Sequence, residues 1–288
     1  MNFCFSPEQA ALQDMAQTFA AKELRQRAAQ MDAQSLYDPT LLQLLGSMGF
    51  LALNVPAAYG GADIPDLLSR ALVIREFAKE CASTAEIVAI NMMVNDVLAV
   101  FGNQQQQEKY LSAAANGALG AFAMTEPNAG SDATSIRTSA TFNGAGYELN
   151  GEKCFISNIG TQVGHHAIVF AVTDLQKGKS GISAFIVDHE TPGLLIGPPE
   201  NKLGIRAAIV SSVTRRRRFF YCHVRPGARA HLHGRPGSGN CGSRNRAKYR
   251  LSFFASAIRC RTGAEARITV VSGGDVHPHR SSPGLDLS

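Results

Sequence analysis

The sequence predicts an α+β fold in which an all-helical N-terminal domain precedes a small antiparallel β-domain. Up to about residue 120, apolar residues recur with the 3.6-residue period of amphipathic helices, behind explicit helix-start signals. Beyond that point the period changes to two, and turn dipeptides separate the strand-like runs. No strand alternates with a helix and no glycine-rich phosphate loop follows a strand, so neither a Rossmann nor a P-loop nucleotide site is supported.

The first helices are marked by capping signals. Ser6, Pro7 and Gln9 have the pattern of an N-cap, an N1 proline and a capping-box partner, which predicts an amphipathic helix from Ser6. The pair Asp38-Pro39 repeats the cap-plus-proline signal and predicts a second, shorter helix. A third helix is expected from about residue 66.

Two further helices are expected between residues 83 and 115. Ser83 and Glu86 form another capping box, which predicts that an apolar helix opens there and runs to Phe101. Gly102 can end this helix in the left-handed conformation. The glutamine run 104–107 leads into residues 108–115, which predict a helix with a polar face rather than a low-complexity tail.

The β-domain is expected from four strand-like runs and the turns between them. Asn143-Gly144 and Asn150-Gly151 are dipeptides typical of tight turns. The expected strands cover residues 138–142, 147–150, 166–173 and 182–188.

The composition favours a globular protein without a membrane span or an export signal. In a chain of 288 residues, 45% apolar residues can fill a sizeable core. The longest apolar stretch, residues 87–101, is interrupted by Asn91, Asn95 and Asp96, and we expect it to be too short and too polar to span a bilayer. Residues 1–10 lack a basic start and a long apolar run, so a cytoplasmic location is the expectation.

Neither the cysteines nor the histidines are spaced as metal ligands. The six cysteines are widely scattered, which predicts reduced thiols buried as small hydrophobic side chains, with no disulfide and no structural metal. His165 and His166 enter a predicted strand, where a solvated or packed pair is expected instead of a metal site.

The net charge of +5 combines two regions of opposite character. Residues 1–210 carry 13 Lys and Arg against 20 Asp and Glu, whereas residues 211–288 carry 15 against 3. The second region holds 14 of the 20 arginines, including the run 215–218. We therefore divide the chain into a helical domain (1–120), a β-domain (121–210) and an Arg-rich tail (211–288).

Two segments of the expected β-domain carry a motif. Residues 123–135 read AMTEPNAGSDATS, with few large side chains, and residues 153–158 read KCFISN on a second strand. Taken alone, the first segment indicates only a surface turn. Together with the helical region before them, the YGG turn at 59–61 and NKLGIR at 201–206, the two segments resemble the acyl-CoA dehydrogenase family from residue 6 to about residue 207.

The resemblance implies a flavoprotein that binds FAD and oxidises acyl-CoA thioesters to the trans-2-enoyl form. A flavin ring is flat and has hydrogen-bonding atoms along one edge, so small residues allow backbone and hydroxyl groups to approach it. By resemblance, Thr125 hydrogen-bonds the pyrimidine edge, Met124 presents its backbone, and Ser131 also contacts the acyl-CoA substrate. The residues implied to contact the cofactor are Phe122, Ala123, Met124, Thr125, Gly130, Ser131, Phe155, Ile156 and Ser157.

Two of these positions depart conservatively from the family pattern. Phe155 stands where the family often has Trp, and Ser157 replaces the usual Thr while keeping a hydroxyl that can reach the flavin N5 side. Gly130 and Asp132 are implied to shape the loop. Glu126 is expected to have a structural place in the loop rather than the role of a catalytic base.

The resemblance also implies a catalytic carboxylate that is not recognisable in this chain. In most members the base is a Glu of a C-terminal helical domain, which also supplies much of the acyl pocket and the subunit interface. After about residue 207 the family pattern stops, and Glu265, Asp275 and Asp286 match no base pattern. We therefore assign no catalytic residue and expect little or no turnover from this chain alone. Members usually form homotetramers and pass electrons to an electron-transfer flavoprotein.

Three interpretations of the Arg-rich tail remain open. Its charge fits a nucleic-acid-binding arm, although no reader motif accompanies it and no nucleic-acid partner is predicted. A lineage-specific extension is the second interpretation. We favour the third, a shift of reading frame near residue 207, because excess Arg, Gly, Pro, His, Cys and Ser without periodicity is typical of a GC-rich gene out of frame.

Two other functions are also kept as alternatives to acyl-CoA dehydrogenation. One is a different oxidation on the same scaffold, such as acyl-CoA oxidation with oxygen or nitroalkane oxidation. The other is a truncated remnant or binding module without catalysis.

Overall fold

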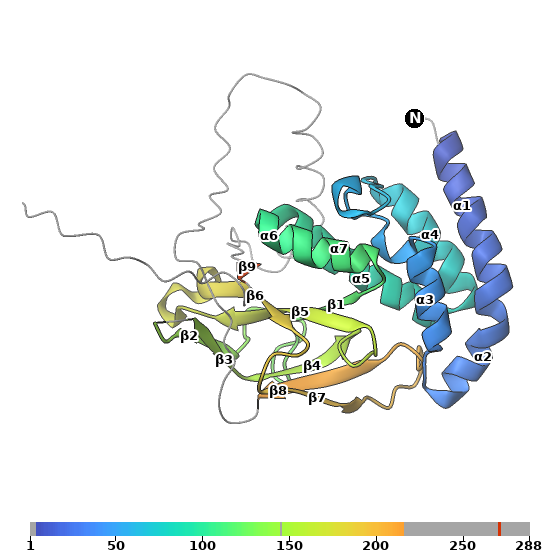
Figure 1. The fold of residues 1–288 in the computed structure, drawn as a ribbon. Coiled ribbons are helices and arrows are strands. Elements are labelled where there is room, and N and C mark those ends of the chain that lie inside the picture. The colour runs from blue at the N-terminus through green and yellow to red at the C-terminus, as the bar shows by residue number, and fades with distance from the viewer. Residues whose placement is uncertain (1–3, 145, 216–269, 272–288) are drawn as a thin grey trace, which may run out of the picture.

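A computed structural model of the protein describes residues 4–144, 146–215 and 270–271, and it has a helical part followed by a β-part (Figure 1). The helical part contains α1 (Pro7–Phe19), the π-helical segment η1 (Ala20–Leu24), α2 (Arg25–Gln34), α3 (Pro39–Ser47), the 3₁₀ turns η2 (Phe50–Ala52) and η3 (Ala57–Tyr59), α4 (Leu67–Glu80), α5 (Ala82–Phe101), α6 (Gln104–Gln106), the π-helical segment η4 (Gln107–Leu111) and α7 (Ser112–Ala115). The helical domain predicted from the sequence is therefore confirmed.

The β-part follows directly. Its elements are β1 (Leu119–Ala123), β2 (Ser139–Phe142), β3 (Tyr147–Asn150), β4 (Glu152–Ser157), β5 (Gly164–Val172), the irregular 3₁₀ segment η5 (Leu175–Gly181), β6 (Ile182–Asp188), β7 (Leu194–Pro199), β8 (Val210–Arg215) and β9 (Val270–Val271). The larger sheet has the order β3-β2-β5-β6-β9 with β1 beside β5, and the smaller sheet has the order β4-β8-β7.

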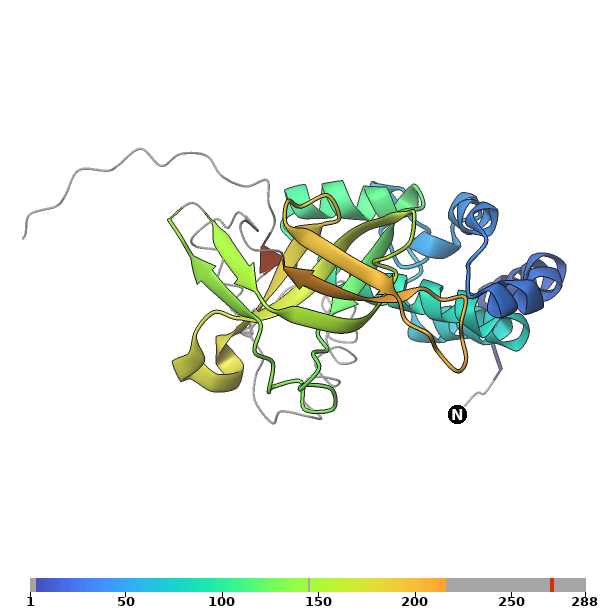
Figure 2. The same ribbon diagram turned by 90° about the horizontal axis from the view of Figure 1, so that it is seen from below.

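The helical part and the β-part lie side by side (Figures 1 and 2). The run from α6 to α7 lies across the outer face of the sheet that contains β1, β5 and β6 (Figure 1). Three apolar clusters fill the interior: one among the helices, one between α5 to α7 and this sheet, and one between the two sheets. Ala207 and Ala208, which precede β8, belong to the cluster among the helices.

Three of the predicted helix starts are confirmed. Ser6 accepts a hydrogen bond from the Gln9 amide while the Gln9 side chain accepts one from the Ser6 amide, which are the two bonds of a capping box. Asp38 caps α3, and Asp66 caps α4, each through a side-chain oxygen that accepts from a backbone amide.

Two predictions for α5 are wrong. The helix begins at Ala82 directly after the extended residue Cys81, so Ser83 lies within the first turn and cannot act as its N-cap. The capping box with Glu86 therefore does not form. Gly102 ends the helix in an extended conformation, with φ −68° and ψ 143°, and not in the left-handed one.

The helix α5 is longer than the apolar run in the sequence. By length and composition its 20 residues could cross a membrane. Contrary to our expectation, length therefore does not exclude a span. Its polar side chains nevertheless make the contacts of a core helix. Asn91 and Asn95 donate to the Leu51 carbonyl, and Asp96 forms an ion pair with the buried Arg70 at 2.7 Å. These contacts favour packing within the protein.

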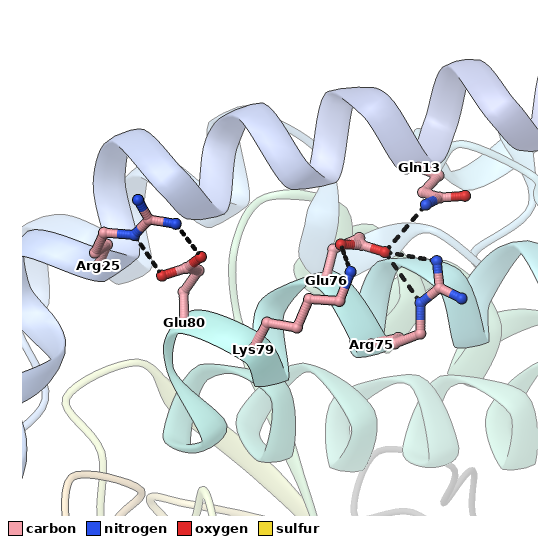
Figure 3. A network of polar contacts seen from close by, with 6 residues as sticks. All are labelled: Gln13, Arg25, Arg75, Glu76, Lys79 and Glu80. Carbon is pink, nitrogen blue, oxygen red and sulfur yellow. Dashed lines mark hydrogen bonds and ion pairs between the residues drawn. The ribbon is translucent and has the colours of Figure 1, made fainter.

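Charged contacts around two glutamates hold α1 and α2 against α4 (Figure 3). Glu76 is 1% exposed and accepts hydrogen bonds from Gln13 on α1 and from Arg75 and Lys79 on its own helix. The Arg75 and Lys79 side chains are themselves about half exposed. We call this group the helix clamp; its residues are Gln13, Arg25, Arg75, Glu76, Lys79 and Glu80.

The predicted strands are found with small shifts of their ends, but the pairing is mixed. The pairs β2–β3, β5–β6, β4–β8 and β7–β8 are antiparallel, whereas β1 lies parallel to β5. Between β1 and β5 the chain forms β2 and β3 of the same sheet and then β4 of the smaller sheet, a connection long enough for a parallel pair. The sequence did not predict β1, β7 or β8, and β8 continues to Arg215, past the expected boundary at residue 210. Residues 216–269 and 272–288 of the Arg-rich tail lie outside the described residues, so its interpretations stay predictions.

The two histidines at the start of β5 are packed, as expected. His166 is 1% exposed, and its ring centroid lies 4.7 Å from that of Tyr110. Burial lowers the pKa of His166 to about 3, and the neighbouring His165 acts in the same direction. Among the described residues, no group of three His, Cys, Asp or Glu side chains could hold a metal ion.

Candidate functional site

A β-bulge in β4 determines which of its side chains face outward. Lys153 pairs with Val213 of β8 and Ile156 with Ser211, so two intervening residues of β4 oppose one of β8. Lys153 and Ile156 can therefore both point inward, although strict alternation would separate residues three positions apart. Phe155 stays outside, 64% exposed, with a φ of 57° that is unusual for a bulky side chain.

The loop between β1 and β2 is closed by Glu126, which is 5% exposed. Its Oε2 accepts from the Arg137 amide at 2.6 Å, and its Oε1 accepts from the Thr138 amide at 3.0 Å and the Thr138 hydroxyl at 2.5 Å. Burial opposes ionisation of this carboxyl, but these bonds and one from Lys153 outweigh it and hold the pKa of Glu126 below its usual value. Glu126 thus has the structural place that was expected.

Lys153 joins this loop to β4. Its Nζ donates to Glu126 Oε1 at 2.7 Å and to the Met124 carbonyl at 3.1 Å. The Cys154 amide donates to the Thr125 carbonyl at 3.0 Å, so the loop and the strand lie side by side. We call the buried Glu126–Lys153 ion pair the loop staple.

The tip of the loop is shaped by Asp132. Its carboxylate accepts from the Thr134 amide at 3.1 Å, from the Thr134 hydroxyl at 2.6 Å and from the Ser135 hydroxyl. Gly130 and Ser131 are exposed just before it. A Cβ added at Gly130 would meet no atom within 4 Å, so the described chain does not itself require glycine there. The open space fits the close approach of another molecule.

The predicted contact residues fall into two groups. Ala123 and Ile156 pack their side chains between the two sheets, so they could offer a cofactor only backbone groups. Phe122 packs its ring against Phe170, with the ring centroids 5.0 Å apart. The other six are, like Phe122, half-buried or exposed, and we call these six the wall: Met124, Thr125, Gly130, Ser131, Phe155 and Ser157.

The end of β4 contacts the helical part. The Ser157 hydroxyl donates to Glu86 Oε1 of α5 at 2.5 Å. Asn158 is buried with a φ of 70° and donates to the Ile87 and Gly120 carbonyls, each at 3.2 Å. The sequence pattern suggested a capping box for Glu86 and gave no sign of its contact with Ser157. Glu86 and Ser157 are 71 positions apart, so no local signal could have revealed this contact.

The wall fits the chemistry of a flavin. Phe155 offers an exposed aromatic face, and Thr125 and Ser157 are half-buried hydroxyl residues, the first on the adjoining loop and the second on the same strand. A flat ring with polar atoms along one edge is held by such a combination of apolar surface and a few placed polar groups. The residues present therefore suit FAD.

The fold and the wall define a protein with the N-terminal and middle domains of an acyl-CoA dehydrogenase. The family model of the acyl-CoA dehydrogenase N-terminal domain matches residues 6–118, and that of the middle domain matches residues 121–216. The chain belongs to the acyl-CoA dehydrogenase family.

Curated relatives support this membership. Acryloyl-CoA reductase (NADH) of Anaerotignum propionicum is 36% identical over 242 residues, which cover 83% of this chain and 59% of the relative. Short-chain specific acyl-CoA dehydrogenase, mitochondrial, of Rattus norvegicus is 36% identical over 231 residues, or 79% of this chain and 53% of the relative. The chain therefore spans little more than half the length of these relatives.

Solved structures share the fold. Butyryl-CoA dehydrogenase from Megasphaera elsdenii has a TM-score of 0.70 at 36% identity, covering 75% of this chain and 57% of that one. A chain in the structure of the electron transferring flavoprotein of Acidaminococcus fermentans has a TM-score of 0.71 at 35% identity, with the same coverage. An acyl-CoA dehydrogenase complexed with FAD from Bacillus anthracis has a TM-score of 0.65 at 31% identity, covering 74% and 36%. FAD is thus the cofactor of the family, as expected.

Proposed function

We propose that this chain is the FAD-binding portion of an acyl-CoA dehydrogenase, which converts an acyl-CoA thioester to its trans-2-enoyl form. The wall carries the proposal, because the bulge holds the Phe155 ring outward and the buried loop staple fixes the loop with Thr125 against β4. The relatives named as acyl-CoA dehydrogenases support the reaction class.

The proposed roles of the chain's residues are binding and orientation. FAD, when bound, supplies the acceptor for the hydride that leaves the β-carbon of the substrate. Thr125 would bind the pyrimidine edge, Ser157 would face the N5 side, and Ser131 would contact the acyl-CoA. The flavin occupies one face of the substrate, so the base that takes the α-proton, a carboxylate in the family, has to lie on the opposite face. Both groups must be present together because the thioester enolate is unstable. Glu126 is unsuited to that step because it is buried and both its oxygens accept internal hydrogen bonds.

We further propose that this chain alone binds FAD weakly and turns over slowly. A flavin cleft without its helical cover stays in contact with water, which weakens the electrostatic interactions inside it. The test is a titration of the purified full chain with FAD, followed by an assay for enoyl-CoA formation with an electron acceptor. Robust turnover would disprove the impairment, and no FAD uptake at saturating cofactor would disprove the flavin site.

The choice of electron acceptor separates the alternative functions. Reduction of an electron-transfer flavoprotein supports the dehydrogenase, whereas hydrogen peroxide formed from oxygen, or consumption of a nitroalkane, supports an oxidase. The Anaerotignum propionicum relative is named as an NADH-dependent reductase, so the assay is also run with an enoyl-CoA and NADH. A chain that binds FAD but is inactive in every assay is an inactive remnant or binding module.

Partners and gene structure are part of the same proposal. The likeness to a chain of the Acidaminococcus fermentans structure supports an electron-transfer flavoprotein as the acceptor. A homotetramer and a cytoplasmic location are proposed from the family pattern and the N-terminal sequence, and light scattering and cell fractionation test them.

The frameshift interpretation is tested on the gene: it is wrong if neither alternative frame after codon 207 encodes the missing strand and helices of the family.

A further inference from the structure

The Ser157–Glu86 hydrogen bond crosses from the β-part to the helical part at the edge of the wall. The Ser157 hydroxyl donates to Glu86 Oε1 across this boundary. A serine hydroxyl has one proton and two lone pairs, and a carboxylate can only accept. The proton of Ser157 is therefore committed to Glu86, and toward any other molecule the hydroxyl can act only as an acceptor.

Glu86 has no structural task in the described segments other than this bond. It does not cap α5, and its Oε2 is buried without a hydrogen-bond partner among the described residues. Lys202 is close enough for Glu86 to oppose the lowering of the Lys202 pKa by burial, but the Lys202 Nζ donates to the Ala208 carbonyl at 2.6 Å. A buried carboxylate oxygen without a partner is unfavourable and calls for an explanation.

We propose that Glu86 is a positioning residue for the cofactor: it fixes the Ser157 hydroxyl as a hydrogen-bond acceptor toward the flavin N5 edge. This inference rests on the proposed function, because it takes the wall as a flavin site. Glu86 does not touch the reacting atoms, and its positioning role is exerted through Ser157.

The direction of this hydrogen bond favours one redox form of the cofactor. N5 of oxidised flavin accepts a hydrogen bond, whereas N5 of reduced flavin carries a proton and donates one. An acceptor hydroxyl therefore binds the reduced form, and a hydroxyl released from Glu86 can rotate and donate to the oxidised form. The negative charge of Glu86 acts in the opposite sense, because it opposes the addition of electrons nearby. A test must separate the two effects.

Two substitutions make that separation. Glu86→Gln removes the charge but keeps an oxygen that accepts from Ser157, whereas Glu86→Leu removes both. The reduction potential of FAD bound to each full-length variant is measured by equilibration with a reference dye. We expect FAD in the Gln variant to have the higher reduction potential, by about 30 mV. For a two-electron couple this corresponds to about a tenfold larger ratio of reduced to oxidised flavin. Both variants are remeasured with Ser157→Ala, where the difference should vanish.

The control is a hydrogen bond of the same kind far from the wall. The Ser6 hydroxyl donates to Glu8 at 2.7 Å at the start of α1, so Glu8→Gln and Glu8→Leu should leave the potential unchanged. Equal potentials for the two Glu86 variants, or a difference that persists with Ser157→Ala, would overturn the inference. If the wild-type chain takes up no FAD, the proposed function fails together with the inference. Normal uptake with equal potentials removes the role of Glu86 alone.

Discussion

The helix clamp and the loop staple each bury one glutamate, and they stabilise its charge with different partners. Glu76 and Glu126 are 1% and 5% exposed, and in both cases burial opposes ionisation while hydrogen bonds hold the pKa below its usual value. The charged partners of Glu76 are about half exposed, whereas the Lys153 side chain is 3% exposed. Water can replace a lost partner in the clamp, but not in the staple.

The difference follows from what each region has to do. The clamp lies at the surface between helices whose apolar faces already pack, with Phe19, Phe50 and Phe77 in mutual ring contact at 4.9 to 5.6 Å. The wall presents few large side chains, because a flat ligand needs close access to backbone and hydroxyl groups. Its loop is therefore fixed by polar contacts from behind, which makes the wall the more fragile region.

The largest effect is expected from breaking the staple with Lys153→Met. This substitution leaves the Glu126 carboxylate buried without its cation, so we expect a loss of about 3–5 kcal/mol in the free energy of unfolding. Urea denaturation of the FAD-free protein measures it. The double variant Lys153→Met/Glu126→Gln should recover part of the loss, because it removes the buried charge and keeps a side-chain oxygen that can accept from a loop amide. A loss below about 1 kcal/mol in the single variant would contradict the contrast with the clamp.

Acidification probes a buried base instead of a buried acid. The pKa of His166 is about 3 in the folded protein, against about 6.5 for an ordinary histidine. Between these values the unfolded chain binds a proton that the folded chain does not, so stability falls as the pH is lowered from about 6.5 toward 3. At pH 5 the expected loss relative to pH 8 is about 2 kcal/mol.

Denaturant titrations at the two pH values measure this loss. In His166→Gln the part of the pH dependence above pH 5 should largely disappear. An unchanged slope in that variant would assign the effect to another group.

A smaller effect, with opposite signs for stability and binding, is expected at the bulge. Phe155→Gly places a residue without a Cβ at φ 57°, so we expect the FAD-free protein to gain up to about 1 kcal/mol in its free energy of unfolding. Removal of the exposed ring should weaken FAD binding about tenfold at the same time. Thermal unfolding and FAD titration measure the two effects. A variant that is less stable without FAD would show that the ring itself supports the fold.

The smallest effect is expected in the clamp. Lys79→Ala removes one partner of Glu76, but Arg75 and Gln13 remain bound and water can reach the site. We expect a loss of about 0.2–1 kcal/mol, smaller at high salt. Urea denaturation at low and high salt measures it. A loss as large as that in Lys153→Met would remove the distinction between the two regions.

The sequence predicted the features that depend on neighbouring residues. The caps at Ser6, Asp38 and Asp66 join side chains to amides two or three positions away. The β2–β3 turn is equally local, because Gly144 has a φ of 94° and the Asn143 side chain accepts from the Gly146 amide. The loop and β4 were found through a family motif. By the same rules the α5 capping box was expected and is absent, because nothing local revealed that the N-cap is Cys81, two residues before Ser83.

Features set by distant contacts could not be predicted in this way. β1 reads LGAFA and β7 reads LLIGPP, so glycine, alanine and proline hide strands that exist through their partners. The outward turn of Phe155 depends on how β4 pairs with β8, and the partner of Glu86 is 71 residues away. In each case the deciding interaction is tertiary.

The presence of Ala207 and Ala208 in the cluster among the helices bears on the order of events during synthesis. Before Ala207, the last residue along the chain that belongs to this cluster is Leu119. Leu119 lies in β1, which pairs with β5, and β5 begins at Gly164. At about 5–20 residues per second, the ribosome delivers Ala208 roughly 4 to 18 seconds after Leu119. For that interval the helices have emerged without two of the side chains that complete their core, and a nascent chain that stalls before codon 207 would leave this apolar surface open to chaperones.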